Sequence, residues 1–288
     1  MSDASHYRGW IRPGPLPPGG IEPEEGETLD YIAGHYRIFQ YRDGHRYSTD
    51  DVLTAWYGTQ WAPRVERALD LGSGIGSVAL FAAWRLPAAR FCTVEAQEVS
   101  YRLAQKSVAY NGLTERFSLY LGDFRDETIL AHEQKFDLVL GSPPYFPPGS
   151  AVAAEHAQAV PARVETRGGI EGYAVAAAHA LAPGGLFAFV LPTRYVERAV
   201  IALETVGLFL LRRREVVFKE GEPSLISLFA AARRRDFPRS FVAASLEDPL
   251  VEPPLVVRTA EGTFHREYTA VRVSFGFPPG NVAEGDQW

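Results

Sequence analysis

Leu69-Asp70-Leu71-Gly72-Ser73-Gly74-Ile75-Gly76 is the stretch of this chain that decides its fold. The apolar residues 68–71 predict a short buried strand, and a helix is predicted over 77–84 directly after the glycines. Glycines permit a tight turn and let a ligand approach the backbone, while free N–H groups at the helix start attract an anion. A tight turn without any ligand has the same pattern, so the surrounding sequence must decide.

Strands and helices alternate along the chain after this stretch. The other elements are strands at 90–94, 117–121, 136–140 and 186–191, and helices at 99–110, 172–181 and 195–206. Residues 208–218 and 225–231 flank a short connector and predict an antiparallel hairpin at the sheet edge. The sequence therefore predicts an α/β fold with a doubly wound, mostly parallel, seven-stranded sheet. Two further strands are expected in the tail, at 255–259 and 270–275.

Composition divides the chain into four regions. Residues 1–27 are rich in Pro, Gly and Glu and predict a flexible leader. Residues 28–60 predict a hairpin followed by a helix, 61–240 form the main domain, and 241–288 are a C-terminal extension. A connection of about twenty residues, 147–169, is long enough to suggest a functional role.

Charge and cysteine content exclude several classes of protein. The 288 residues include 29 Lys+Arg, 35 Asp+Glu and one cysteine, Cys92, for a net charge of −6. One cysteine excludes an intrachain disulfide framework and a cysteine zinc site, and the seven histidines show no metal-binding spacing. We see no signal peptide and no apolar run long enough to cross a membrane. We therefore expect a cytoplasmic, metal-free monomer.

Glu95 ends the second strand of the alternation, 25 residues after Asp70. A carboxylate there can accept hydrogen bonds from ribose hydroxyls, although a solvated strand end is the simpler interpretation. We favour a nucleotide ligand because Glu95 and the glycines fall at the same sheet edge. A dinucleotide fingerprint would place its third glycine one residue later than Gly76.

Ser142-Pro143-Pro144-Tyr145 follows the fourth strand and is the sharpest chemical signal. Two prolines fix the backbone and remove N–H donors, which leaves carbonyl oxygens exposed. A side-chain oxygen and a carbonyl can then accept both hydrogens of an exocyclic amino group, while the Tyr145 ring stacks on a planar base. A proline-stiffened turn with a packed aromatic ring is the structural alternative.

Together these motifs resemble class I S-adenosylmethionine-dependent methyltransferases. The glycine stretch is similar to their first motif, and Ser142–Tyr145 is similar to the (Asn/Asp/Ser)-Pro-Pro-Tyr motif of enzymes that methylate amino or amide nitrogens. The resemblance implies a Rossmann-like fold with S-adenosylmethionine as cofactor. It assigns Asp123 to the adenine amino group of the cofactor and implies that the cofactor is held by Asp70, Gly72, Ser73, Gly74, Gly76 and Glu95.

Residues 40–53 narrow the resemblance. They are similar to the Gln…Gly-Tyr-Arg…Asp-x-x-Leu-Leu segment of bacterial valine-tRNA adenine-N6 methyltransferases, with His45 in place of the usual Tyr. In that family this segment packs over the cofactor, which implies roles for Arg46, Thr49 and Asp50. A plain helix N-cap explains Thr49 equally well. Phe146, after the Pro-Pro-Tyr motif, also fits the family.

We therefore expect methylation of adenine N6 in tRNA or another structured RNA. The predicted catalytic residues are Ser142, Pro143, Pro144 and Tyr145, and the substrate contacts are Tyr145 and Phe146. Ser142 is the usual first residue in cytosine-N4 DNA methyltransferases, so that activity stays open. Protein glutamine-N5 and small-molecule amine methylation, or a catalytically silent RNA-binding scaffold, also stay open.

The overall acidity does not exclude an RNA partner. Residues 211–240 carry eight basic and four acidic groups, which gives this stretch a local charge of +4. Arginines there can pair with phosphates, or the stretch can be a solvated edge hairpin. The basic residues are Arg212, Arg213, Arg214, Lys219, Arg233, Arg234, Arg235 and Arg239.

Overall fold

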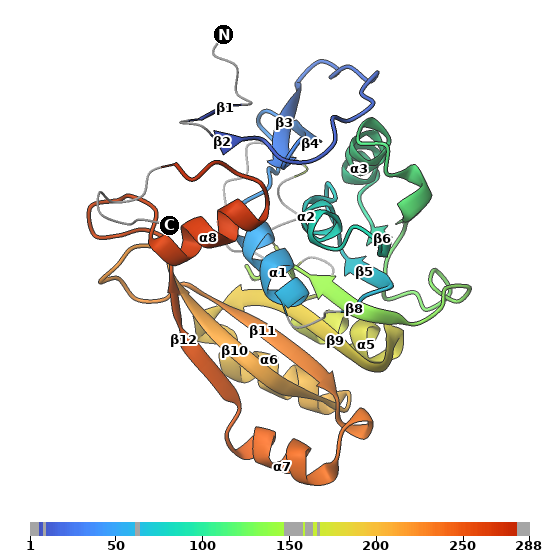
Figure 1. Ribbon diagram of the computed structural model, residues 1–288. Coiled ribbons are helices and arrows are strands. Elements are labelled where there is room, and N and C mark those ends of the chain that lie inside the picture. The colour runs from blue at the N-terminus through green and yellow to red at the C-terminus, as the bar shows by residue number, and fades with distance from the viewer. Residues whose placement is uncertain are drawn as a thin grey trace.

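The computed structural model describes residues 6–7, 10–60, 64–146, 158, 164–165 and 168–280. Its centre is an eight-stranded sheet in the order β12-β10-β11-β9-β8-β5-β6-β7 (Figure 1). The strands are β5 (Arg67–Leu71), β6 (Arg90–Glu95), β7 (Phe117–Leu121), β8 (Phe136–Gly141), β9 (Leu181–Pro192), β10 (Leu208–Val217), β11 (Ile226–Arg233) and β12 (Leu250–Val256). Only β11 runs antiparallel to its neighbours. The predicted α/β fold with a doubly wound, mostly parallel sheet and an antiparallel hairpin is confirmed, but β12 rather than the β10–β11 hairpin forms that edge of the sheet.

Two predictions at the C-terminal end of the chain are wrong. The sheet has eight strands rather than seven, because β12 pairs parallel with β10 at the edge. β12 begins before the predicted 255–259, since an edge strand tolerates its two prolines. The predicted strand 270–275 is instead part of the helix α8 (Arg266–Ser274). Tyr268, Val271 and Phe275 are buried at helical spacing, and this period outweighs the short local alternation.

Helices cover both faces of the sheet (Figure 1). One face packs against α1 (Thr49–Gln60), α2 (Ser77–Arg85), α3 (Glu98–Tyr110) and α8. The other face packs against α5 (Ile170–Ala180) and α6 (Val196–Thr205). The short helix α7 (Arg239–Glu247) contacts β10, and its Val242 belongs to the core of the first face. Each face of the sheet has its own hydrophobic core, and successive residues of β5 point into different cores. Ala68 belongs to the core of the first face and Leu69 to that of the second.

A separate hairpin, β3 (Glu27–Ala33) and β4 (Tyr36–Tyr41), packs on the helices of the first face, as predicted for a hairpin there. The Phe39 N–H donates to Ser107 Oγ of α3 at 2.9 Å. The Gly34 N–H donates to the Phe275 carbonyl beyond α8 at 2.8 Å. A two-stranded pair, β1 (His6–Tyr7) and β2 (Trp10–Ile11), precedes the hairpin. The division into four regions stays a prediction.

Gly34, in the β3–β4 turn, leaves no room for a side chain. Its φ is +48°, and a Cβ atom would lie 2.1 Å from the Trp84 ring and 2.7 Å from the Pro13 carbonyl oxygen. We expect Gly34→Ala to lower the free energy of unfolding by about 3 kcal/mol through overpacking and backbone strain. Gly221→Ala is the control, since its φ is +83° with nothing within 4 Å. Equal losses in urea denaturation would contradict the packing argument.

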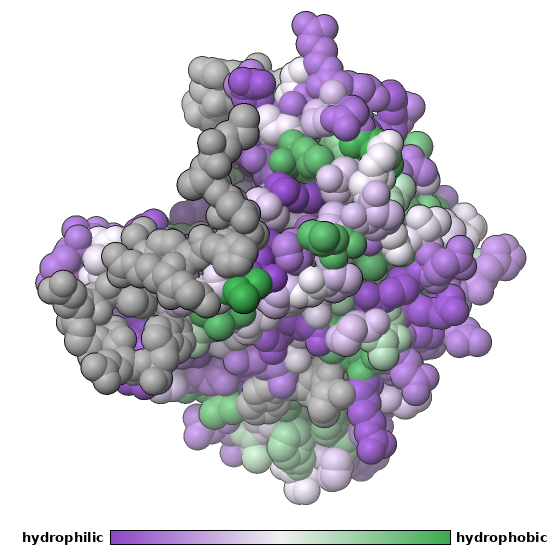
Figure 2. Space-filling view, turned by 45° about the horizontal axis from the view of Figure 1, so that its top comes forward, coloured by the Kyte–Doolittle hydropathy of each residue, from purple (hydrophilic) through white to green (hydrophobic). Residues whose placement is uncertain are grey.

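The basic stretch 211–240 is largely engaged within the protein. Arg212 is 0% exposed, which contradicts a role in binding phosphate. Other ion pairs join Arg213 to Glu215, Arg214 to Glu267, Arg233 to Asp236 and Arg234 to Glu204. On the face seen in Figure 2, polar side chains predominate and apolar ones form small separate groups. Among the described residues, no helix combines the length and apolar character needed to span a bilayer.

Candidate active site

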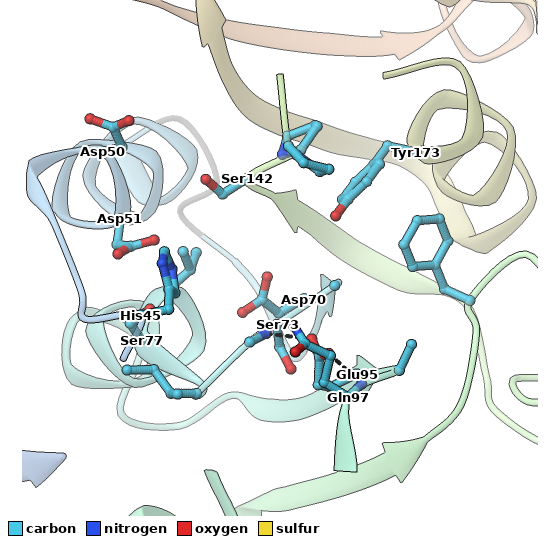
Figure 3. A pocket seen from close by; sticks show the side chains of 18 of the residues that line it. His45, Asp50, Asp51, Asp70, Ser73, Ser77, Glu95, Gln97, Ser142 and Tyr173 are labelled. Atoms are coloured by element: carbon cyan, nitrogen blue, oxygen red, sulfur yellow. Dashed lines mark hydrogen bonds between the residues drawn. The ribbon is translucent and has the colours of Figure 1, made fainter. Parts of the chain in front are cut away.

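A cavity of about 460 Å³ lies at the carboxyl ends of β5, β6 and β8 (Figure 3). This edge is where open α/β sheets bind ligands, and the volume is ordinary for a small-molecule site. Predicted site residues that line it are Arg46, Asp50, Asp70, Gly72, Ser73, Gly74, Glu95, Asp123, Ser142, Pro143, Pro144, Tyr145 and Phe146. The structure thus brings together most of the residues that the sequence singled out.

The glycine loop between β5 and α2 is held in a shape that needs glycine. The φ angles of Gly72 and Gly74 are +61° and +55°, in the left-handed region. A Cβ atom at Gly72 would lie 2.2 Å from Tyr173 Oη, whereas one at Gly74 would meet nothing within 4 Å. Between them, the buried hydroxyl of Ser73 has no hydrogen-bond partner among the described residues. A buried hydroxyl without a partner fits a loop that closes on a ligand.

Glu95 and Asp70 tie this loop to the sheet. The Gly74 N–H donates to Glu95 Oε2 at 2.7 Å, and the Gln97 N–H donates to Oε1 at 2.6 Å. Asp70 accepts from the Ala79 N–H in the first turn of α2 at 3.1 Å. Each carboxylate oxygen has a second lone pair, so Glu95 can still accept from a ligand hydroxyl.

Acidic side chains crowd the floor of the cavity. Burial, together with the nearby carboxylates of Asp51 and Glu95, raises the pKa of Asp70 well above its ordinary value. Burial likewise raises the pKa of Asp51 to about 7. Burial makes these groups costly to ionise, and a cationic ligand beside them would make ionisation favourable.

The Ser142–Tyr145 motif begins directly after β8 and lines the same cavity as the glycine loop. Pro143 is buried, whereas Ser142 and Tyr145 are partly exposed. The Tyr145 and Phe146 ring centroids are 5.1 Å apart. Phe146 forms a β-bridge with Val164, and its carbonyl accepts from the Glu165 N–H at 2.9 Å. Most of the long connection 147–169 lies outside the described residues.

Four predicted cofactor residues have other contacts in the structure. Asp123 pairs with Arg125, and Arg46 Nη2 lies 2.9 Å from Asp30 Oδ2, although both predicted residues line the cavity. Two residues are not among those that line it. Thr49 is the first residue of α1 and helps to lower the pKa of Tyr268 in α8, which burial raises. A Cβ atom at Gly76 would lie 3.3 Å from Ala104 Cβ, so that glycine allows α2 to pack on α3.

Some lining residues were not predicted. Tyr173 of α5 reaches the cavity from the second face of the sheet, and Phe124 contacts it with ring centroids 4.6 Å apart. Gln97 also lines the cavity, two residues after Glu95. Its position just past a strand end was a usable signal, whereas nothing near Tyr173 in the sequence points to the site.

A comparison with protein families decides the identity of this fold. The model of the methyltransferase small domain matches residues 59–202, which include the glycine loop, Glu95 and the Ser142–Tyr145 motif. The chain belongs to this methyltransferase family. The resemblance to methyltransferases is confirmed, and the protein is an S-adenosylmethionine-dependent methyltransferase.

Curated relatives of this methyltransferase cover most of its length. One, from Actinobacillus pleuropneumoniae serotype 7 (strain AP76), is 29% identical over 72% of this chain and 80% of its own. Another, from Porphyromonas gingivalis (strain ATCC BAA-308 / W83), is 31% identical over 59% of this chain and 68% of its own. Both are named tRNA1(Val) (adenine(37)-N6)-methyltransferase.

Solved structures agree with the fold of the methyltransferase. A predicted O-methyltransferase, protein Atu636, from Agrobacterium tumefaciens matches 78% of this chain and 96% of its own. The TM-score is 0.56 and the sequence identity is 18%. At that identity the match supports the fold and leaves the substrate to other arguments.

The cavity of the methyltransferase fits its cofactor. S-adenosylmethionine carries a cationic sulfonium and a cationic amino group, and when bound it supplies an electrophilic methyl group. The acidic floor suits those charges, while the unpartnered Ser73 hydroxyl and the open space above Gly74 suit a ligand that touches the loop. Among the described residues, no cluster of His, Cys, Asp or Glu is arranged to hold a metal ion.

Asp51 predicts an unusual pH dependence for the methyltransferase. Its folded pKa of about 7 exceeds the ordinary value of about 4, so the folded state binds more protons between these limits. We expect the free energy of unfolding without cofactor to fall as pH rises from about 4 to about 7, by at most about 1.4 kcal/mol per pH unit for this group. Cofactor affinity is expected to rise over the same range.

Asp51→Asn tests this expectation, because its amide oxygen can still accept from the Ser48 N–H. Urea denaturation of the wild type and the variant at several pH values measures how the free energy of unfolding changes with pH. We expect this change to be smaller in the variant. An identical pH dependence in both proteins would show that Asp51 titrates as an ordinary carboxyl group.

Proposed function

We propose that this methyltransferase transfers a methyl group to N6 of an adenine in tRNA. The observation that carries the proposal is that Ser142–Tyr145 and the glycine loop line one cavity. In this arrangement, the motif that would accept hydrogen bonds from an amino group lies next to the loop that would hold the cofactor. The names of the relatives support tRNA as the substrate class. A tRNA substrate would place the enzyme in the cytoplasm.

The cofactor would be held by the residues around the glycine loop. Gly72 and Gly74 allow its close approach, the Ser73 hydroxyl supplies a hydrogen bond, and Glu95 accepts from the ribose. Asp70 offers a buried negative charge, and Asp123 would exchange part of its contact with Arg125 for the adenine amino group.

The target base would enter on the opposite side. Ser142 Oγ and the Pro143 carbonyl would accept the two amino hydrogens, which directs the nitrogen lone pair at the methyl carbon. Tyr145 would stack on the base with Phe146 beside it. Catalysis would come mainly from positioning and electrostatics. A base in a tRNA loop costs little to extrude into such a pocket.

Two measurements test this function. Mass spectrometry of tRNA nucleosides is expected to show a loss of N6-methyladenosine in a deletion strain against its parent. Purified protein with labelled cofactor is expected to methylate tRNA from that strain, and Ser142→Ala or Tyr145→Ala should lower the rate at least about 10-fold. Because Ser142 replaces the commoner Asn, methylated cytidine is scored in the same digest. Transfer to protein but not to RNA would contradict the proposal.

A further inference from the structure

Asp50 lies at the start of α1 and lines the cavity beside Tyr145. Its Oδ2 accepts a hydrogen bond from the Tyr145 hydroxyl at 3.4 Å. The neighbouring Asp51 is used differently, since it accepts from the Ser48 N–H at 2.8 Å and closes the first turn of the helix. Figure 3 shows the two carboxylates pointing in different directions, with the Ser142 hydroxyl directed toward their side of the cavity.

This contact places Asp50 with the substrate motif rather than with the cofactor loop. Its hydrogen-bonding partner belongs to Ser142–Tyr145, whereas the ties of Asp70 and Glu95 run to α2 and the glycine loop. The hydrogen bond that caps the helix is accepted by Asp51 and not by Asp50. The hydrogen bond between Asp50 and Tyr145 is long, at 3.4 Å. Asp50 therefore has acceptor capacity left for a donor that arrives with the substrate.

We propose that Asp50 accepts the proton that the target amino group releases during methyl transfer. This inference rests on the proposed function, because it needs an amino group held by Ser142 and Pro143. It assigns a catalytic role to a residue that the resemblance placed with the cofactor.

The step balances with the groups of the proposed reaction. The amino nitrogen uses its lone pair to bond the methyl carbon, while the carbon–sulfur bond breaks and its electron pair goes to sulfur. As the nitrogen begins to gain positive charge, the proton that was hydrogen-bonded to Ser142 Oγ leaves that hydrogen bond and moves to the Asp50 carboxylate. The neutral carboxyl group then passes that proton to water. Removing the proton as the bond forms avoids a full charge on a weakly basic nitrogen.

The surroundings of Asp50 suit a proton acceptor. Burial raises its pKa above the ordinary value, and the hydrogen bond from Tyr145 opposes that rise. Asp51 on the same helix and Tyr268 of α8 also interact electrostatically with it. His45, Asp70 and Glu95 line the same cavity. A raised pKa makes the ionised carboxylate a stronger base.

The test is a pH profile of single-turnover methyl transfer to tRNA from the deletion strain, at saturating cofactor. For the wild type we expect the rate to fall as pH drops, because a protonated Asp50 cannot accept a proton. Asp50→Asn is expected to lower the rate at pH 8 about 100-fold. It is also expected to abolish the fall in rate toward low pH, which we call the acid limb of the profile. Asp50→Glu keeps the carboxylate and should retain the limb, and Glu222→Gln, on an exposed turn, should match the wild type.

Tyr145→Phe adds a measurement, the pH at which the acid limb falls, that would not change if Asp50 had only a structural role. It keeps the ring but removes the hydrogen bond that lowers the pKa of Asp50, so the acid limb should shift to higher pH. Calorimetric affinity for S-adenosylmethionine and the melting temperature are measured for each variant, and Asp50→Asn should leave both close to wild type.

The outcomes separate this inference from the proposed function. A wild-type enzyme that methylates no RNA would remove the proposed function itself. An active wild type together with an Asp50→Asn variant of equal rate and unchanged pH profile would overturn the role of Asp50 alone. If Asp50→Asn lost its affinity for the cofactor, the role of Asp50 as proton acceptor would likewise be overturned, and Asp50 would be a cofactor-binding residue.

Discussion

Gly74→Val is expected to weaken S-adenosylmethionine binding roughly 100-fold or more, which corresponds to about 2.7 kcal/mol. Gly74 has a φ of +55°, and the space where its Cβ would stand is open cavity. A valine there would occupy the volume that the cofactor needs. Its β-branched side chain would also disfavour the left-handed backbone by about 1–2 kcal/mol and so distort the loop. Isothermal calorimetry measures the affinity directly.

Gly184→Val is the matched control for this experiment. Gly184 has a φ of +74°, nothing lies within 4 Å of its Cβ position, and it is exposed near the start of β9. The same backbone strain should lower the stability of both variants by a similar amount. Only Gly74→Val should lose affinity. Wild-type affinity in Gly74→Val would show that the glycine loop does not hold the cofactor.

Arg212→Ala is expected to lower the free energy of unfolding by about 3–5 kcal/mol. The Arg212 side chain is fully buried between β10 and α1. Its Nη2 donates to the Tyr57 carbonyl at 2.6 Å, its guanidinium lies 3.7 Å from the Tyr57 ring centroid, and Nη1 lies 3.3 Å from Glu252 Oε1. Truncation would leave a cavity and a poorly solvated carboxylate at once.

Arg212→Met with Glu252→Gln separates these two losses. Methionine fills much of the space, and the glutamine removes the uncompensated charge, so the double variant should recover a large part of the lost stability. Urea denaturation with an unchanged slope measures each value. A single variant Arg212→Ala within about 1 kcal/mol of the wild type would refute this role for the buried guanidinium.

The central sheet and the position of the site could be predicted because they depend on local order. The glycine loop, Glu95 and Ser142 each follow a strand, and parallel strands end at one edge of a sheet. Residues from other layers could not be placed in this way. Tyr173 reaches the cavity from α5, and its contact with Gly72 depends on how that helix packs.

The errors at the C-terminal end have a similar origin. Two prolines concealed the start of β12, because the sequence does not reveal which strand lies at an edge. The charges of 211–240 suggested an open basic surface, yet Arg212 is in the core because Tyr57 and Glu252 meet it there. Thr49 interacts with Tyr268, which lies more than 200 residues later in the chain. Such long-range pairings leave no local signature.

The contacts of α8 with the N-terminal half constrain how this protein can be made. Trp84 Nε1 donates to the Ser274 carbonyl, and the Phe81 and Phe275 ring centroids are 5.0 Å apart. The ribosome therefore completes every strand of the sheet before it delivers the helix that supports α2 and the start of α1. Contacts of such long sequence separation form slowly, which leaves the nascent enzyme with an exposed apolar surface until synthesis passes residue 275.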